Sequence, residues 1–462
     1  MRQRSHSRLP TSAALVALAA LFCAAAAAGQ DAPEERRKLK DFGSSLDRLK
    51  WDAKKNAAVE KRRKSKDEGA AEGAAEADDV DIVRVETSLV VCDLLVLDPQ
   101  GHPVEGLTRE DFEVAEDGRA QEVGTFAHGE GSKLPRTIVL VIDYSGSQYP
   151  FLKTSVEAAK TLVDGLGPAD RMAVVTDDVE VIQDFTGDKE KLKKRLDSLV
   201  KKSASGGGLF GALGMTRRFG RSAQYSALMA TLREAFGEED RRPIVVFQTD
   251  GDELPLLRNP VVSPVVPPEL LPPDMREAAT RASRRLQVYL HQNVRAFSLE
   301  DIYRAAERSR ATVYAIIPGY RLLGLPPERQ TEQARAHAEA SLAAWVKPED
   351  QAKVRERFEE RARRLPPEAR RYQLELSVKA QAALAGVAEV TGGWVDFLEQ
   401  PSQASDIYSR ILSDINLRYV LGYYPTNKQH DGTRRLVRVE VRGHPEYKIL
   451  GRKSYIAPGP DQ

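Results

Sequence analysis

The feature that most constrains the fold is a series of unbroken apolar runs, which alternate with helical patterns between residues 136 and 252. "RTIVLVID" and "RPIVVFQTDG" have no polar face, and parallel strands of this kind are buried on both sides. Helical periodicity occupies the intervals, in "LKTSVEAAKTLVDGL", "KEKLKKRLDSLVKK" and "SAQYSALMATLREAF". The alternation predicts an α/β fold with a doubly wound, mainly parallel sheet that helices cover on both faces.

The same alternation resumes in "SLEDIYRAAERSRATVYAIIPG" and "LAGVAEVTGGWVDFLEQ", so we expect the sheet domain to span residues 131–400. Two segments interrupt it. Residues 253–297 are Pro-rich and then amphipathic, and residues 320–380 are charged with helical periodicity. We therefore expect two helical insertions in the domain.

Short strand patterns flank this domain on both sides. Residues 80–130 carry strand runs split by "DPQGHP" and "EDGR", and residues 401–462 carry a helix and then strands. These two β-rich, sandwich-like segments are candidates to pair with each other. Alternation predicts that one of Tyr423 and Tyr424 is buried, and that the arginines of "RRLVRVEVRG" face solvent.

The N-terminal segment is typical of an exported protein. "MRQRSHSR" and the apolar "AALVALAALFCAAAAAG" predict a signal peptide over residues 1–29, with a membrane anchor as the alternative. We expect a periplasmic, envelope-bound or extracellular protein with no transmembrane span after cleavage. Residues 30–79 are charged and Ala-rich, which predicts a tether that is part helical and part disordered. Cys92 then remains as a single cysteine in an apolar run, where a buried, unreactive thiol is expected.

Polar residues follow two of the buried runs. Asp143, Ser145 and Ser147 follow the first, and Asp250 follows the second. The carboxyl ends of parallel strands form the edge at which open sheets bind ligands. Carboxylate and hydroxyl oxygens suit a hard divalent cation, with Mg²⁺ as the first candidate and Mn²⁺ or Ca²⁺ as alternatives. The competing interpretation is that these residues only cap the helix that follows.

These residues carry a resemblance to a known family. Asp143, Ser145 and Ser147 match the D-x-S-x-S motif of von Willebrand factor type A (VWA) domains, and "TDG" at 249–251 resembles their second acidic loop. "VEGLTREDFEVAEDGRAQEVGTF" and "LRYVLGYYPTN" are similar to an exported VWFA-related family described from Acidobacteria. The resemblance covers roughly residues 80–250, 298–318 and 381–457. It implies a metal-ion-dependent adhesion site that a middle-loop hydroxyl completes. Ser222, where the family has threonine, is the best match, and Ser203 and Ser205 are alternatives.

The resemblance implies a binding protein and not an enzyme. A carboxylate of a partner protein or envelope ligand would complete the cation's coordination, and the helical insertions would cap the site. An envelope scaffold with a vestigial metal site is the alternative, and a metal-dependent hydrolase is a more distant one. The net charge of +1 gives no reason to expect nucleic acid. "GGGLFG" at 206–211 satisfies G-x-G-x-x-G but follows a helix, so it predicts a loop and not a dinucleotide site.

Overall fold

The computed structural model describes residues 49–52, 57–60, 89–128, 135–204, 223–237, 242–260 and 266–459. Its central sheet has six strands in the order β12-β11-β10-β7-β8-β9, of which only β9 runs antiparallel to its neighbour. The mainly parallel α/β fold predicted from the sequence is confirmed. The strands are β7 (Arg136–Ile142), β8 (Arg171–Thr176), β9 (Val181–Thr186), β10 (Arg242–Gln248), β11 (Thr312–Pro318) and β12 (Val395–Leu398).

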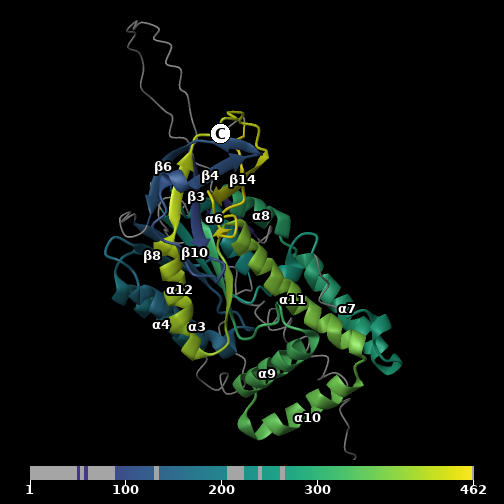
Figure 1. Cartoon of the computed structure of the whole chain (residues 1–462). Helices are drawn as coiled ribbons and strands as arrows, with labels where there is room; N and C mark the ends of the chain where they lie inside the picture. The colour runs from purple at the N-terminus through teal and green to yellow at the C-terminus, as the bar shows by residue number, and fades with distance from the viewer. Residues whose placement is uncertain are drawn as a thin grey trace, which may run out of the picture.

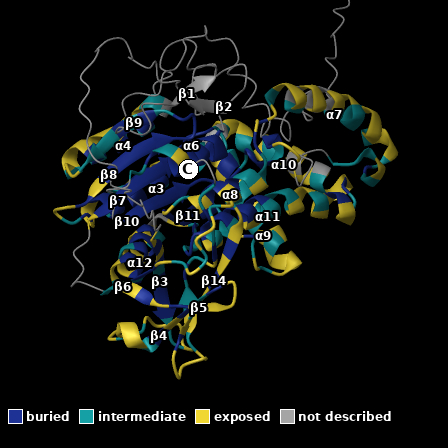
Figure 2. Cartoon of the chain, turned by 90° about the horizontal axis from the view of Figure 1, so that it is seen from above, coloured by how far each residue is buried: buried dark blue, intermediate teal, exposed yellow. Residues whose placement is uncertain are grey.

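Every residue of β7, β10 and β11 is buried, as their unbroken apolar sequences require. Alternate side chains of β7 enter two separate hydrophobic cores, with Val139 and Val141 in one and Ile138 and Leu140 in the other. Helices therefore pack on both faces of the sheet, which is the dark-blue layer in Figure 2. One face carries α6 (Gln224–Glu234), α8 (Leu299–Arg308) and α11 (Pro367–Val390), and the other carries α3 (Leu152–Asp164), α4 (Lys189–Ala204) and α12 (Ala404–Leu417), which follows the 3-10 helix η6 (Pro401–Gln403).

A β-module made from both flanking segments packs against one end of this domain, with its strands at the top of Figure 1. Two four-stranded sheets, β15-β3-β13-β6 and β16-β14-β4-β5, share one hydrophobic core. In it Tyr423 is fully buried, whereas Tyr424 is 52% exposed, as the alternation predicts. Cys92 is buried in the same core, and burial raises the pKa of its thiol to about 12. The elements are β3 (Val90–Leu97), η1 (Arg109–Asp111), β4 (Phe112–Glu116), β5 (Arg119–Gln121), β6 (Val123–His128), β13 (Tyr419–Tyr423), β14 (Arg434–Val441), β15 (Lys448–Leu450) and β16 (Ser454–Ile456).

The expectation that the arginines of β14 face solvent is wrong for one of them. Arg435 is buried and pairs with the equally buried Glu116, whose carboxylate also accepts hydrogen bonds from the hydroxyls of Tyr423 and Tyr455. Arg435 shares its strand face with Val437, so it points inward, and the charge is tolerated because a carboxylate meets it there.

The β-module joins the domain at the amino ends of the parallel strands. Arg242, the first residue of β10, lies 3.5 Å from the carboxylate of Asp93 on β3. The buried Arg418 donates to the Asp93 carbonyl at 3.2 Å and to the carboxylate of Asp414 on α12 at 2.6 Å. The carboxyl ends of the strands therefore lie at the opposite end of the molecule.

The two expected insertions are helical and pack on each other, beside the α/β domain in Figures 1 and 2. A small core joins Leu271 of the first to Leu365 and Ala369 of the second. α11 crosses residue 380 without a break, so the expected end of the second insertion falls inside a helix that continues into the domain core. The remaining elements are η3 (Tyr149–Phe151), η4 (Leu254–Leu256), η5 (Pro268–Leu270), α7 (Pro273–Asn293), α9 (Pro327–Trp345) and α10 (Pro348–Arg364).

Within the expected tether, β1 (Leu49–Asp52) pairs antiparallel with β2 (Ala57–Glu60), so this part is strand and not helix. "LKWD" alternates apolar and polar residues with the period of a strand. The expected signal peptide, the rest of the tether, Ser205, Ser222 and the "GGGLFG" segment lie outside the described residues. Among the helices that the structure describes, none combines the length and apolarity needed to span a bilayer.

Candidate metal centre at the carboxyl edge of the sheet

The predicted acids meet where the strand order of the sheet reverses. β8 and β9 lie on one side of β7, and β10, β11 and β12 lie on the other. Asp143 follows β7, and its backbone amide donates to the carbonyl of Gln248 at the end of β10. Asp250 follows β10 two residues later. The pair therefore sits at the reversal point, where open α/β sheets bind ligands.

Asp143 is held rigidly by its surroundings. Its side chain is buried, and its Oδ1 accepts a hydrogen bond of 2.8 Å from the backbone amide of Ser145. Its Oδ2 accepts from the hydroxyl of Thr249 at 2.8 Å and from Nε2 of Gln224 at 2.9 Å. Both carboxylate oxygens are thus oriented by groups from two loops and from the first residue of α6.

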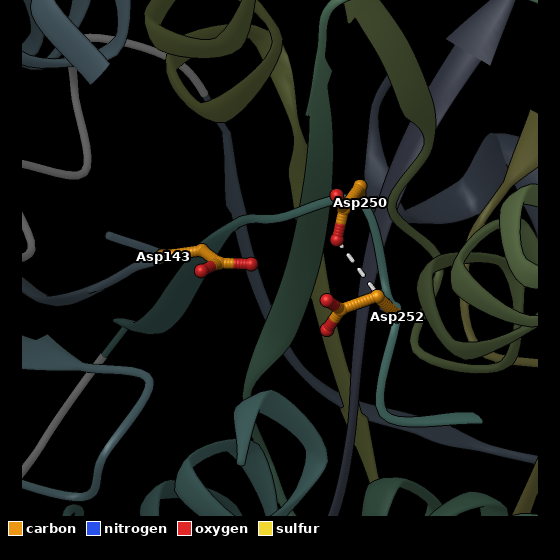
Figure 3. A group of neighbouring side chains, drawn as sticks. All are labelled: Asp143, Asp250 and Asp252. Atoms are coloured by element: carbon orange, nitrogen blue, oxygen red, sulfur yellow. Dashed lines mark hydrogen bonds between the residues drawn. The ribbon is translucent and has the colours of Figure 1, made fainter. Parts of the chain in front are cut away.

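The two serines of the first loop continue the site toward a third acid. The hydroxyls of Ser145 and Ser147 lie 3.0 Å apart, and Ser147 donates to Oδ2 of Asp252 at 3.0 Å. Asp143, Asp250 and Asp252 can each place a carboxylate oxygen within 4.8 Å of the other two. Figure 3 shows the carboxylate of Asp143 pointing toward Asp250 and Asp252. The backbone amide of Asp252 donates to the carboxylate of Asp250 at 3.2 Å.

Burial and mutual repulsion disfavour the charged forms of these acids. Burial and then the charge of Asp143 raise the pKa of Asp250 from 3.8 to about 6. Burial raises the pKa of Asp143, and the pKa of Asp252 is raised well above its usual value by burial and the charges of Asp250 and Asp143. Such a cluster gains most from a bound positive charge.

Two glutamines complete the arrangement. Nε2 of Gln148 donates to Asp250 at 2.7 Å, and Nε2 of Gln224 donates to Asp252 at 2.5 Å. The Oε1 atoms of both glutamines are buried and receive no hydrogen bond from the described residues. Buried oxygens without a donor are uncommon in native proteins, and a cation or its water ligands would satisfy them. The donor set of carboxylates, hydroxyls and amide oxygens thus fits a hard divalent cation.

The structure brings together four of the five predicted site residues, namely Asp143, Ser145, Ser147 and Asp250. The fifth, Ser222, falls in an undescribed segment, and the alternative Ser203 lies in α4. Sequence reasoning missed Asp252, Gln148, Thr249 and Gln224. "TDGDE" did contain a signal for Asp252, because Asp252 has the same two-residue spacing from Asp250 that Ser145 has from Asp143.

The second insertion packs beside this centre. His337 of α9 stacks on Phe151 of η3, directly after the serine loop, with ring centroids 5.3 Å apart. The ring of Tyr320 also packs against that of His337, with centroids 4.0 Å apart. Burial raises the pKa of Tyr320, and the charge of Asp250 adds to the rise.

Comparisons with known proteins give structural likeness at low similarity. No family model matches the sequence, and no curated protein matches it. Similar solved structures include a von Willebrand factor type A protein from Catenulispora acidiphila (10% identity, 76% of this chain and 74% of that chain, TM-score 0.28). Another is manganese-loaded TRAP from Plasmodium vivax, with 12% identity over 72% of this chain and 83% of that chain and a TM-score of 0.25. A third is the vWF domain of the type V pili tip protein Mfa5 from Porphyromonas gingivalis, with 12% identity over 61% of this chain and 95% of that chain and a TM-score of 0.26. Likeness at this level carries no inference about function.

Proposed function

We propose that this chain is an exported protein of the VWA type that binds a partner through a divalent cation at the carboxyl edge of its sheet. The observation that carries the proposal is the convergence of Asp143, Asp250 and Asp252 beside two buried amide oxygens that accept no hydrogen bond from any described residue. The motif match of Asp143, Ser145 and Ser147 to VWA domains supports the same site. Export is supported by the signal-like residues 1–29.

Asp143, Ser145, Ser147 and Asp250 would hold the cation, with Asp252 as an additional carboxylate. The bound ion would supply a fixed positive charge for an external oxygen donor, which we take to be a carboxylate of the partner. The chain's own contribution is orientation: Thr249 fixes Asp143, and Gln148 fixes Asp250. We take the role to be binding, which is what the match of Asp143, Ser145 and Ser147 to VWA domains implies.

The insertions would supply the rest of the partner surface. Three protein carboxylates exceed the charge of one divalent cation, so the metal contact alone is expected to be weak. A partner must therefore bury further surface nearby. α9 is in position for this, because its His337 packs on Phe151 of η3, which follows the serine loop.

Calorimetric titration with MnCl₂ and MgCl₂ tests the cation site. We expect saturable binding by the wild type, none by Asp143→Ala, and wild-type binding by Asp406→Ala, which removes an exposed aspartate of α12. Equal heats for the wild type and Asp143→Ala would refute the site. Capture of an envelope protein by the immobilised chain, with and without EDTA, then tests the partner.

A scaffold function is the second candidate, and the β-module favours it. Strands from residues 90–128 and from residues 419–456 pair into two sheets around one core, which is a rigid architectural unit. Under this alternative the same envelope partner would be captured equally well with and without EDTA.

A further inference from the structure

Gln224 lies between two of the three acids. It is the first residue of α6 and is fully buried. Its Nε2 donates to Asp143 at 2.9 Å and to Asp252 at 2.5 Å, so the amide nitrogen bridges two carboxylates. Its Oε1 is buried and accepts nothing from the residues with described positions.

We infer that Gln224 is itself a ligand of the cation through Oε1, and that its amide group turns over when the cation binds. The inference rests on the proposed cation site and deepens it. It assigns to an amide oxygen the role that the VWA resemblance gives to a middle-loop hydroxyl, for which Ser222 is the sequence match.

The orientation of the amide depends on what lies between the acids. With no cation present, Nε2 must face the carboxylates, because an amide oxygen at 2.5 to 2.9 Å from carboxylate oxygens would be repelled. With a cation between them, the amide oxygen is attracted and the NH₂ group is not. The two ends of an amide are nearly equal in size, so the exchange needs only rotation of the terminal group.

The backbone beneath Gln224 is fixed, which confines the change to the side chain. The backbone amides of Tyr225 and Ser226 donate to Oε2 of Glu253 at 2.5 Å and 3.2 Å. The hydroxyl of Ser226 donates to Oε1 of the same glutamate at 3.0 Å, and Arg295 pairs with it. The first turn of α6 is thus anchored by a buried carboxylate that belongs to the acidic loop itself.

Gln148 shows a related arrangement at Asp250, the acid that Gln224 does not contact. Its Nε2 donates to Asp250 at 2.7 Å, and its buried Oε1 also lacks a donor among the described residues. It contacts one acid, whereas Gln224 contacts two, so Gln224 is the stronger candidate for a direct ligand.

Calorimetric titration of MnCl₂ into the full chain tests the inference with Gln224→Leu. We expect this change to weaken Mn²⁺ binding by about tenfold or more, as loss of a group at a metal site does. The matched control is Gln183→Leu on β9, a buried glutamine whose Nε2 donates to the carbonyl of Asp184, and its affinity should not change. Wild-type affinity in Gln224→Leu overturns the inference but leaves the proposed site standing. Absence of Mn²⁺ binding by the wild type removes both.

Nuclear magnetic resonance of ¹⁵N-glutamine-labelled protein reads the amide directly. The Gln224 side-chain NH₂ signals, assigned by their loss in Gln224→Leu, should shift on addition of Mg²⁺ while those of Gln183 stay in place. Unchanged Gln224 signals in protein that calorimetry shows to be loaded would overturn the inference. If Gln224→Leu does not fold, Gln224→Asn retains the amide on a side chain one methylene shorter. It should show the same loss of affinity, and wild-type affinity would overturn the inference.

Discussion

Glu253 and Arg295 form an ion pair in which both side chains are almost completely removed from solvent. Glu253 directly follows Asp252 at the start of the first insertion, and Arg295 lies near the end of that insertion. The Glu253 carboxylate also accepts hydrogen bonds from two backbone amides in the first turn of α6. One buried pair therefore ties the insertion and a core helix to the candidate metal centre.

Glu253→Gln should destabilise the fold strongly. It leaves Arg295 buried without the carboxylate that it pairs with, a change that lowers the free energy of unfolding by about 3 to 5 kcal/mol. Urea denaturation in EDTA measures the effect. The control is Arg258→Met, which breaks an exposed pair with Asp301 and should cost about 1 kcal/mol or less. A similar small loss for Glu253→Gln would contradict the prediction.

Asp252→Asn should stabilise the cation-free protein and weaken its response to cations. With carboxylate oxygens within 4.8 Å of one another, each repulsion between two of the acids in their charged forms is on the order of 1 to 3 kcal/mol, and the substitution removes the two that involve Asp252. Thermal unfolding in EDTA should move to higher temperature. The further rise produced by excess Mg²⁺ should be smaller than in the wild type, and an equal rise would speak against Asp252 as part of the centre.

The stability of the cation-free protein should fall as Asp250 ionises. Its pKa of about 6 lies above the ordinary 3.8, so its contribution is fully present below pH 3.8 and is lost as the pH rises through 6. Between pH 4 and pH 7 we expect the wild type to lose on the order of 2 kcal/mol relative to Asp250→Asn.

Urea denaturation of the two proteins in EDTA gives this difference, and excess Mg²⁺ at pH 7 should abolish it. The comparison with Asp250→Asn cancels titrations that both proteins share, including that of His337. A wild type that gains stability relative to Asp250→Asn over this interval would contradict the prediction.

Protonation of His337 at low pH should loosen the packing of the second insertion. Burial lowers its pKa to about 4, so its neutral form stabilises the fold above the ordinary value near 6.5, and this contribution is lost as the pH falls toward 4. Hydrogen exchange of α9, corrected for intrinsic rates, should therefore be faster at pH 5 than at pH 7.5. His337→Phe retains an aromatic ring against Phe151 and should remove the difference. Equal protection of wild-type α9 at both pH values would rule the mechanism out.

The sequence predicted the parts of the site that follow directly from buried strands. Asp143 and Asp250 could be placed because their apolar strands end just before them, and parallel strands end at one edge. Gln224 could not be placed, because it reaches the acids only through the docking of α6 on Glu253. The contact joins Tyr225 and Glu253, which are 28 positions apart, and no periodic pattern in the sequence indicates it.

The error at Arg435 has a different origin. Arg435 is separated from Val437 and Val441 by an even number of positions, so the two-residue period of a strand already places it on their inward face. The prediction placed every arginine of the strand on the solvent face, and only the structure reveals the buried Glu116 that makes the inward position of Arg435 favourable. Pairing of buried charges between distant strands is information that local pattern does not contain.

The opposite placement of the β-module and the acids has a mechanical consequence. At the amino ends of the strands, Asp93 of the β-module contacts Arg242 and Arg418, whereas Asp143 and Asp250 lie at the carboxyl ends. A pull between the module and a ligand held at the acids would run lengthwise along β7 and β10. Their shared ladder of parallel hydrogen bonds would then be loaded in shear, with all bonds resisting together, and not opened one bond at a time.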